Sequence, residues 1–217
     1  MNLNGTTALV TGANRGLGRH FAQQLLERGA STVYAAARNP EAIDLPGVVP
    51  IQLDITDPES VARAAATATG VEVLINNAGI SLHQNFVTGD VDAIRREMET
   101  NFFGTLHVIR AFASARAILN VNSRLSWLNY VGANGYAASK AAEWSLTNGV
   151  RLELPDALVT GLYLSGTDTD MMAGYDGPLN DPADVVRQAL DGIEADATEV
   201  IADEDTALTR AELIGAA

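Results

Sequence analysis

The sequence predicts an α/β fold: a single doubly wound Rossmann-type domain with a parallel sheet of about seven strands and helices on both faces. Short β-rich runs alternate with amphipathic helical stretches from the first residues onward, which is typical of a parallel sheet. A glycine-rich loop directly follows the first apolar run, as in dinucleotide-binding folds. No linker, low-complexity stretch or repeat interrupts the alternation, so the 217 residues are expected to form one domain, 1–217.

Two helices are predicted in the first third of the chain, one from its apolar face and the other from its start signal. Leu17, Phe21 and Leu25 recur at i, i+4 and i+8 on one helical face, and Gly29 ends that helix. The run TDPE at 56–59 is a capping box with proline at the first helical position, so a second helix is expected to start there. Between and after these helices, strands are expected at residues 6–10, 32–36, 48–53 and 71–75.

The rest of the chain continues the alternation. A long helix is expected from Asp90 to about Arg116, followed by a strand at 117–121, a helix at 135–153, a strand at 157–164 and a last helix that opens at Asp181-Pro182. The connections near 116–117 and 154–156 are very short for turns that must reverse the chain. Three explanations are open: the long helix ends earlier, the loops are shortened, or flexible residues are absent from the sequence.

Composition excludes several functional classes. The net charge of −13 argues against non-specific nucleic-acid binding, which needs a basic face. The acidic C-terminal segment 181–217 holds ten acids against two arginines and is expected to be a solvated surface. With no cysteine there can be no disulfide, thiolate zinc site or cysteine nucleophile, and the three histidines, His20, His83 and His107, lack metal-ligand spacing. We therefore expect no metal site.

The N-terminus has no basic region followed by a long apolar run, and no apolar run approaches the ~18 residues of a membrane span. We therefore expect a cytoplasmic protein with neither a membrane nor a nucleic-acid partner.

The loop after the first strand reads TGANRGLG, residues 11–18. Its glycines, Gly12, Gly16 and Gly18, allow a sharp turn off the strand, the approach of bare backbone to a pyrophosphate, and close packing of helix and strand. The N-terminus of the helix that follows offers free N–H groups to the anion. The alternative is a strand-to-helix turn that binds no ligand, but the position after the first strand favours binding.

Tyr136 and Lys140 lie four residues apart on a predicted helix and therefore share one face. A nearby ammonium stabilises a phenolate, so Lys140 is expected to lower the pKa of Tyr136 and make it a proton donor to a carbonyl. Ser123 stands just past a strand end, where it could orient the substrate oxygen; Ser126 is a near competitor. Asn101, in the middle of the long predicted helix, is either a packing residue or the holder of a water that relays protons to Lys140.

Together these motifs resemble the short-chain dehydrogenase/reductase family over nearly the whole chain, in particular an NADP-preferring, carbonyl-reductase-like member. The glycine loop matches the family's TGxxxGxG, NNAG at 76–79 matches the segment after its fourth strand, and Ser123, Tyr136 and Lys140 match its Ser…YxxxK. Asn101 matches its catalytic asparagine. The resemblance implies hydride transfer with a nicotinamide cofactor, Tyr136 as general acid or base and Lys140 as its partner and ribose ligand.

The resemblance also implies a set of cofactor contacts. Asp54 and Ile55 match the pair that contacts the adenine, and Asn77, Ala78 and Gly79 would line the adenosine side. The family's Pro-Gly and carboxamide-binding threonine are replaced by SGTDT at 165–169, in which Gly166 and Thr169 are the best matches. The expected cofactor-binding residues are Gly12, Asn14, Arg15, Gly16, Leu17, Gly18, Arg38, Asp54, Ile55, Asn77, Ala78, Gly79, Tyr136, Lys140, Gly166 and Thr169.

Arg38 decides the choice of cofactor. It follows Ala37 at the end of the second strand, close to where an acid would bind the ribose of NAD and repel a 2′-phosphate. A guanidinium there can bind the phosphate bidentately, and Arg15 could close on the same phosphate. We therefore predict NADP(H), although a lone strand-end arginine is more often simply solvated.

A small hydrophobic ketone, aldehyde or alcohol is the expected substrate. Apolar and aromatic side chains cluster around the predicted site and in the expected substrate loop, about 166–180, although at least half of them are expected to belong to the core. These residues are Phe86, Leu125, Trp127, Leu128, Tyr130, Met171, Met172 and Tyr175. An alcohol dehydrogenase working oxidatively and a non-enzymatic NADP-binding regulatory protein are the alternatives. The resemblance implies a homodimer or homotetramer.

Overall fold

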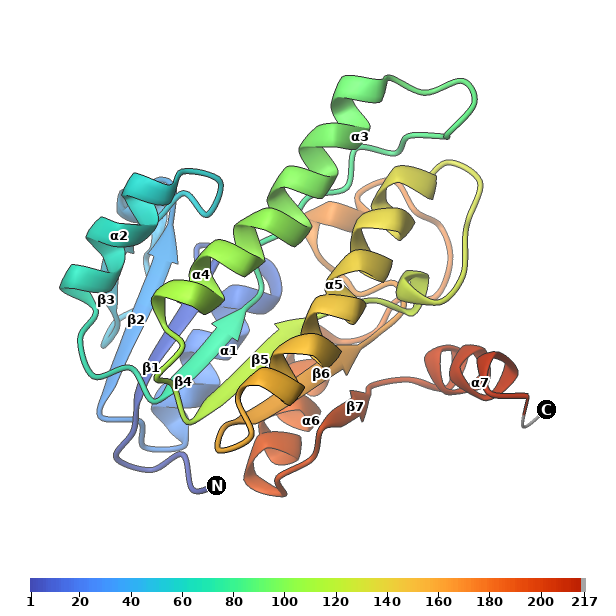
Figure 1. The fold of residues 1–217 in the computed structure, drawn as a ribbon. Coiled ribbons are helices and arrows are strands. Elements are labelled where there is room, and N and C mark those ends of the chain that lie inside the picture. Colours follow the sequence, from blue (N-terminus) through green and yellow to red (C-terminus); the bar gives the residue numbers. More distant parts are fainter. Residues whose placement is uncertain (216–217) are drawn as a thin grey trace.

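The computed structural model describes residues 1–215 and shows a seven-stranded, fully parallel sheet between two layers of helices (Figure 1). The strand order is β3-β2-β1-β4-β5-β6-β7. The strands are β1 (Thr7–Thr11), β2 (Thr32–Ala37), β3 (Val49–Gln52), β4 (Val73–Asn76), β5 (Ala117–Val121), β6 (Leu158–Tyr163) and β7 (Glu199–Ile201). The predicted fold class is confirmed.

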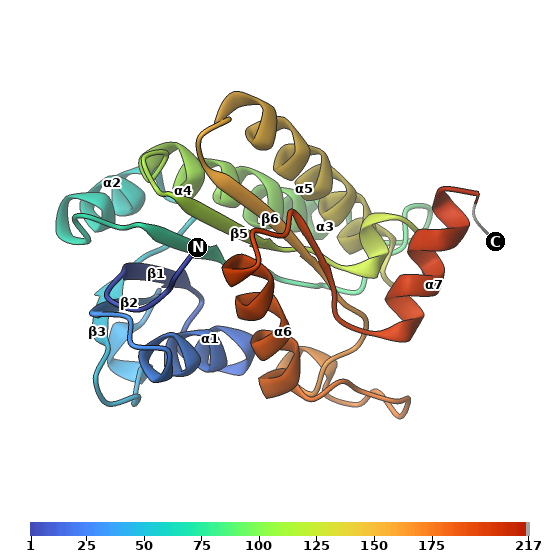
Figure 2. The same ribbon diagram turned by 90° about the horizontal axis from the view of Figure 1, so that it is seen from below.

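The helices divide between the two faces of the sheet (Figure 2). The apolar sides of α1 and α6 pack on one face in a single buried cluster, and those of α2, α4 and α5 pack on the other. The helices are α1 (Gly16–Glu27), α2 (Pro58–Thr67), α3 (Val91–Met98), α4 (Thr105–Ala111), α5 (Asn134–Glu153), α6 (Pro182–Glu194) and α7 (Glu204–Leu213). Because the central strands are buried on both faces, they read as nearly continuous apolar runs.

The strand order places the functional edge of the sheet. The chain starts at β1, moves outward to β3 and returns to β4 on the other side of β1, so the direction of the winding changes between β1 and β4. In open α/β sheets a crevice forms at the carboxyl ends of the strands at such a point. The glycine loop after β1 and the NNAG segment after β4 therefore face one another.

The long helix predicted from Asp90 to Arg116 is wrong in its extent. The structure has α3, then one π-helical segment over Glu99–Gly104, then α4, which ends at Ala111. Gly104 permits the close approach of Ile55, because a Cβ at this position would lie 2.7 Å from that side chain. Residues 112–116 form a turn held by the bond from the Ala115 N–H to the Phe112 carbonyl. The early helix end therefore accounts for the short connection near 116–117.

The connection near 154–156 is a genuinely short turn. Helix α5 ends at Glu153, and the Ala157 N–H donates to the carbonyl of Leu154 at 3.1 Å before β6 begins. Pro155 and Asp156 are residues that such a turn favours. The two short connections therefore have different causes: an early helix end near 116–117 and a short turn at 154–156.

The helix that begins at Asp181-Pro182 was predicted to be the last one, and this prediction is wrong. α6 is followed by β7 and α7, and its buried residues Val185, Leu190 and Ile193 belong to the core. β7 completes the predicted number of strands, but its three residues were too short a run to recognise. The acidic segment is thus a structural part of the domain as far as residue 215: α6 buries its apolar side, whereas Leu208 and Leu213 of α7 are exposed.

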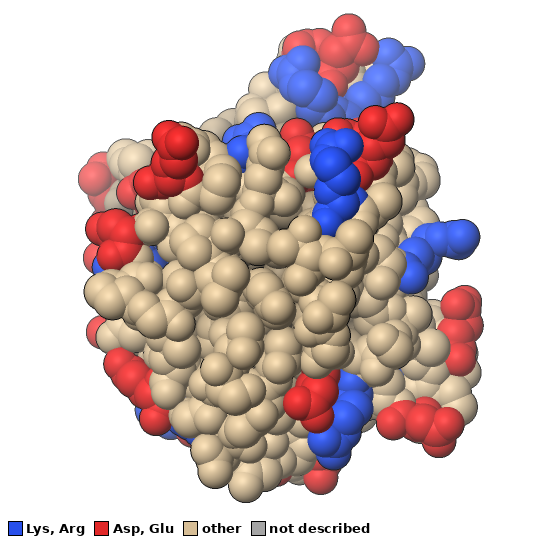
Figure 3. Space-filling view, turned by 90° about the vertical axis from the view of Figure 1, so that its left-hand side faces the viewer, with Lys and Arg blue, Asp and Glu red and all other residues tan. Residues whose placement is uncertain are grey.

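Charge is distributed in small groups on the side of the molecule where β3 and α2 lie. Figure 3 shows a broad uncharged area there, with Lys and Arg side chains as separate groups near its margins and close to acidic ones.

The edge strand β3 contains Pro50, which lacks an N–H and so discourages pairing with a further strand.

Two sequence expectations concern membranes and metals. No helix within residues 1–215 combines the length and the apolar character needed to cross a membrane. The same residues contain no group of three or more His, Asp or Glu side chains placed to hold a metal ion.

Asp203 joins the C-terminal helix to the loop after β6. Its Oδ1 accepts from the Thr206 N–H at 2.9 Å and caps α7, and its Oδ2 accepts from the Ser165 N–H at 2.8 Å and from Asn180 Nδ2 at 3.1 Å. Burial by itself raises the pKa of Asp203, but the bonds from the Ser165 and Thr206 backbones outweigh it and the net pKa is lowered. The carboxylate therefore stabilises the fold above its ordinary pKa, and this contribution is lost as pH falls through the lowered value.

We predict that Asp203→Ala lowers the free energy of unfolding by about 1–2 kcal/mol at pH 7, the usual range for a lost aspartate cap. Urea denaturation at a series of pH values measures this loss, and the gap to the unaltered protein is expected to narrow as the medium becomes acidic. Glu204→Ala, which removes the next acid in the chain, is the matched control. Equal losses for the two variants would contradict the assignment.

Candidate active site

One cleft of about 940 Å³ opens at the carboxyl edge of the sheet, a volume suited to a cofactor and a small substrate. The glycine loop, the ends of β4 and β5, the start of α5 and the loop after β6 line it. Most predicted site residues lie in this lining: Gly12, Asn14, Arg15, Gly16, Leu17, Arg38, Asp54, Ile55, Asn77, Ala78, Gly79, Ser123, Tyr136, Lys140, Gly166 and Thr169. Gly18 and Asn101 lie behind the lining and act on the site through packing and hydrogen bonds.

The glycine loop fits an anion such as a pyrophosphate. Gly12 has φ +66°, which favours glycine, and a Cβ at Gly18 would overlap the carbonyl oxygen of Gly12. Helices α2, α3, α6 and α7 each begin after an aspartate that accepts from a first-turn N–H. α1 instead follows Arg15, which makes no such cap within the described chain, so the first-turn N–H groups of α1 are left for a ligand.

Asn77 and Thr11 hold the glycine loop against the end of β4. The Asn77 Nδ2 donates to the carbonyls of Thr11 at 2.9 Å and of Gly12 at 3.2 Å. Thr11 Oγ1 accepts from the N–H groups of both Asn77 and Ala78 at 3.0 Å. Asn77 therefore shapes the loop as well as lining the cleft. The sequence analysis did not single out Thr11, although its place before Gly12 in the loop motif was a usable signal.

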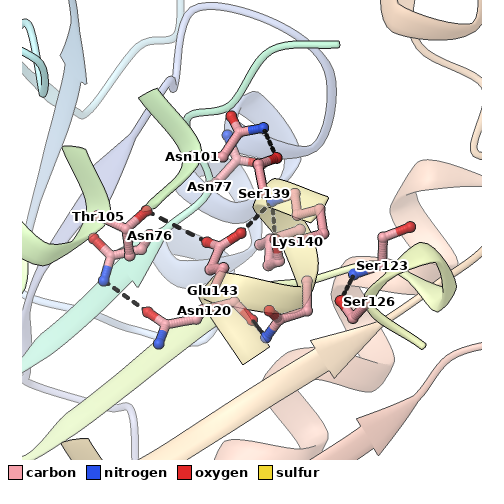
Figure 4. A network of polar contacts seen from close by, with 12 residues as sticks. Asn76, Asn77, Asn101, Thr105, Asn120, Ser123, Ser126, Ser139, Lys140 and Glu143 are labelled. Carbon is pink, nitrogen blue, oxygen red and sulfur yellow. Dashed lines mark hydrogen bonds and ion pairs between the residues drawn. The ribbon is translucent and has the colours of Figure 1, made fainter. Parts of the chain in front are cut away.

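Ser123, and not Ser126, faces the cleft. Ser123 Oγ accepts from the Leu125 N–H at 3.1 Å and lines the cleft. Ser126 is buried beneath it, where its hydroxyl accepts from the Ser123 N–H at 3.4 Å and completes a capping box. Figure 4 shows this pair beside the Lys140 network. The choice of Ser123 over its near competitor is consistent with these positions.

Tyr136 and Lys140 come together as their spacing predicts, with the Lys140 Nζ 5.8 Å from the centre of the Tyr136 ring. The prediction that the pKa of Tyr136 is lowered is wrong for the protein without a bound ligand. Burial raises the pKa of Tyr136, and this outweighs the lowering by Lys140 and by a hydrogen bond with Ser123. Glu143 raises it further. The phenol is therefore firmly protonated at neutral pH.

Lys140 is held by two oxygen atoms deep in the site. Its Nζ donates to the Val121 carbonyl at 2.8 Å and to Glu143 Oε2 at 2.5 Å (Figure 4). Burial by itself lowers the pKa of Lys140, but the attraction of Glu143 and of Tyr136 is larger in sum, and the net pKa is raised. Glu143 was not predicted from the sequence. Its signal was its place one helical turn after Lys140, on the same face of α5.

Asn101 lies in the π-helical segment and is fully buried. Its Oδ1 accepts from the Ile80 N–H at 2.8 Å, and its Nδ2 donates to the Ile80 carbonyl at 2.9 Å. The same Nδ2 donates to Ser139 Oγ at 2.8 Å (Figure 4). The side-chain amide thus joins the π-helical segment to the segment after β4 and to α5. These hydrogen bonds agree with a packing role for Asn101. Its proton-relay role stays a prediction.

Arg38 and Arg15 both line the cleft. Arg15 is drawn to Asp170 in the loop after β6, with 2.8 Å between its guanidinium and the carboxylate. Both side chains are 69% exposed, so the pair is worth about 1 kcal/mol or less, and Arg15 can leave it for a phosphate at little cost. Asp54 turns one carboxylate oxygen to the backbone and hydroxyl of Thr56.

The substrate side of the cleft holds only part of the predicted apolar set. Leu125, Tyr130, Met171, Met172 and Tyr175 line the cleft. Trp127 instead stacks on Tyr163, with ring centres 4.4 Å apart, and Phe86 and Leu128 lie outside the lining. The expectation that at least half of these eight residues belong to the core is wrong: none of them is in the buried core clusters, and Phe86 is exposed.

Comparison with known proteins agrees with this geometry. The family model described as short chain dehydrogenase matches residues 6–177. The chain belongs to this family. It resembles carbonyl reductase (NADPH) 2 of Sus scrofa, with 32% identity over 165 residues that cover 71% of this chain and 68% of the relative. It also resembles L-xylulose reductase of Homo sapiens, with 34% identity over 164 residues that cover 70% and 67%.

A solved relative extends the likeness to nearly the whole chain. A short chain dehydrogenase of Burkholderia cenocepacia, crystallised in complex with NADP, superposes with a TM-score of 0.95 at 38% identity and covers 99% of this chain and 94% of its own. The predictions of the family, of an oxidoreductase and of the doubly wound fold are therefore confirmed.

We predict that Gly18→Ala abolishes measurable binding of NADPH and lowers stability, because the added Cβ would overlap the Gly12 carbonyl and displace the loop. Fluorescence titration with NADPH and thermal unfolding measure the two effects. Gly149→Ala in α5 is the matched control, since a Cβ there meets open space and should be neutral or stabilising by up to ~1 kcal/mol. Unchanged NADPH binding by Gly18→Ala would refute the role given to the loop.

Proposed function

We propose that this chain catalyses the NADPH-dependent reduction of a ketone or aldehyde to an alcohol, with Tyr136 as the proton donor. The observation that carries the proposal is the meeting of Ser123, Tyr136 and Lys140 in one cleft beside an anion-binding glycine loop. Ser123 follows the end of β5, Tyr136 and Lys140 lie one turn apart on α5, and each of the three suits a distinct step of carbonyl reduction.

The nicotinamide cofactor, when bound, supplies the hydride that adds to the carbonyl carbon. Ser123 orients the carbonyl oxygen by donating a hydrogen bond from its hydroxyl. Tyr136 donates its phenolic proton to the same oxygen as negative charge develops there. Lys140 stabilises the phenolate that remains and offers a further N–H to the cofactor's ribose. Proton and hydride together account for the two hydrogens of the alcohol.

Arg38 and the absence of an acid at Ala37 support NADP(H) as the cofactor. A carboxylate at Ala37 would repel a 2′-phosphate, whereas a guanidinium at Arg38 can bind it. Carbonyl reductase (NADPH) 2 carries NADPH in its name and the Burkholderia cenocepacia relative was solved with NADP, so the cofactor prediction is confirmed.

The substrate is proposed to be a hydrophobic carbonyl compound. Leu125, Met171 and Met172 give the cleft an apolar wall, and Tyr130 and Tyr175 add aromatic surface at its rim. Tyr130 and Tyr175 are exposed and therefore leave the entrance broad. Such a site favours aryl or alkyl ketones over charged compounds.

We predict that Tyr136→Phe lowers kcat for carbonyl reduction by at least about 10²-fold, because the variant lacks the donated proton. NADPH absorbance followed against a panel of ketones and aldehydes measures the rate. Tyr175→Phe removes a hydroxyl from the same cleft and is the matched control, which should keep the rate within a few fold. Wild-type rates in Tyr136→Phe would show that the mechanism is wrong.

We predict that Ala37→Asp combined with Arg38→Leu moves the preference from NADPH towards NADH, because the pair of changes removes the phosphate ligand and adds a ribose ligand. The ratio of kcat/KM for the two cofactors is the measurement, and it should fall by at least about tenfold, the loss of one charged hydrogen bond. Arg63→Leu on α2 removes another exposed arginine and should leave the ratio alone. Equal kcat/KM for the two cofactors in the unaltered protein would already contradict the account.

A further inference from the structure

The chain contains a single lysine, Lys140, and this lysine is buried in the site, with 4% of its surface exposed. Glu143, one helical turn later on α5, is buried as well, with 1% exposed. Each charge taken out of water costs several kcal/mol unless it is paired and hydrogen-bonded. A carboxylate directly behind the site lysine therefore requires an explanation beyond packing.

The contacts of Lys140 divide between structure and cleft. Glu143 Oε2 and the Val121 carbonyl accept two of its three ammonium N–H bonds, at 2.5 and 2.8 Å. Lys140 also lines the cleft, next to Gly79: a Cβ added to Gly79 would lie 3.8 Å from the Lys140 Nζ. The third N–H of the ammonium is therefore available on the cleft side. Glu143 thus fixes the position of the ammonium and leaves one donor for a ligand.

Glu143 is itself held from two elements. Its Oε1 accepts from Thr105 Oγ1 of α4 at 3.4 Å, and its backbone carbonyl accepts from Thr147 Oγ1 at 2.8 Å. Figure 4 shows the carboxylate between Thr105 and Lys140. The carboxylate is therefore placed by Thr105 of α4 and by Lys140 of α5, with its charge directed at the lysine.

Few other charges reach this part of the site. Within the described chain, the charged groups that face Tyr136 are Lys140 and Glu143 from α5 and Glu97 from α3. Glu97 accepts from the Leu82 N–H at 2.6 Å, away from Lys140. The neighbouring strands β4 and β5 present the neutral amides of Asn76 and Asn120. Glu143 is thus the only carboxylate among residues 1–215 that contacts the ammonium.

We propose that Glu143 is a positioning residue of this site: it holds Lys140 and offsets its charge, so that Tyr136 keeps its phenolic proton and the site favours reduction over oxidation. The inference rests on the proposed function, because it concerns the direction of that reaction. Reduction needs a phenol that donates a proton, whereas oxidation of an alcohol needs a phenolate that accepts one.

The electrostatics support this reading. An unopposed ammonium would lower the pKa of Tyr136, and Glu143 works against it by raising the pKa of both Tyr136 and Lys140. Because the two groups are close, they lose protons as a coupled pair. Removing the carboxylate charge makes the loss of the first proton from the pair easier, whichever of the two groups gives it up.

The single lysine permits a direct test that does not depend on turnover. In protein grown with ¹³C-labelled lysine, one side-chain signal reports Lys140, and its chemical shift is followed against pH by NMR. In Glu143→Gln the midpoint is expected at lower pH than in the unaltered protein. Glu97→Gln, which removes a carboxylate that does not touch the lysine, should leave the midpoint in place. The same midpoint in Glu143→Gln and the unaltered protein would overturn the proposal.

The unaltered protein provides a second criterion if Glu143→Gln does not fold. Its lysine signal is expected to titrate above the ordinary lysine pKa of ~10.4, because the carboxylate outweighs burial. A midpoint below that value would overturn the proposal without any variant.

The directional part is tested by rates. In Glu143→Gln the ratio of kcat for alcohol oxidation to kcat for carbonyl reduction, each measured at saturating substrate and cofactor at pH 7, should rise by about tenfold, the effect of one nearby charge, and the pH profile of oxidation should move to lower pH. Thr105→Val loosens Glu143 but keeps its charge, and should leave the profile in place. An unchanged ratio in Glu143→Gln would reject the bias towards reduction. If the unaltered protein reduces no carbonyl compound, the proposed function fails together with this bias, and the lysine titration still decides the placement of Glu143.

Discussion

The ammonium of Lys140 has to keep its charge inside the protein, and the architecture of the site follows from this constraint. Three elements meet to satisfy it: β5 provides the Val121 carbonyl at its carboxyl end, α5 provides Glu143, and α4 provides Thr105 to hold that carboxylate. A buried lysine without such partners would lose its proton and could not stabilise a phenolate. The burial that makes the charge costly also strengthens its action on Tyr136.

The parallel sheet brings these partners together because all its strands end at one edge. The change of winding direction between β1 and β4 leaves a crevice there, and the glycine loop forms one wall of it. Within the described residues, helix α1 begins without a side-chain cap, as does α5 after Ala133. Aspartates complete α2, α3, α6 and α7, whereas α1 follows Arg15 and keeps its first-turn N–H groups for an anion. The cofactor side and the reacting side thus share one edge.

Features that depend on neighbouring residues in the sequence could be predicted. Features that depend on contacts between residues far apart in the sequence could not. The glycine loop, the four-residue spacing of Tyr136 and Lys140, and most strand positions are local patterns and were predicted well. The π-helical segment depends on Asn101 reaching the Ile80 backbone and on Gly104 meeting Ile55, contacts across more than twenty residues. β7 was too short to recognise. The net pKa of Tyr136 was predicted in the wrong direction, because spacing reveals the lysine but neither the burial nor the carboxylate behind it.

The central claim is that Lys140, held from behind by Glu143 and Val121, presents its remaining N–H to a cofactor in the cleft. A crystal structure of the protein soaked with NADP⁺ tests this most directly. The account predicts the 2′-phosphate beside Arg38 and the nicotinamide ribose within hydrogen-bond distance of the Lys140 Nζ, with the bond between Lys140 and Glu143 kept. A cofactor bound away from Lys140, or a Lys140 that leaves Glu143 when the cofactor binds, would contradict it.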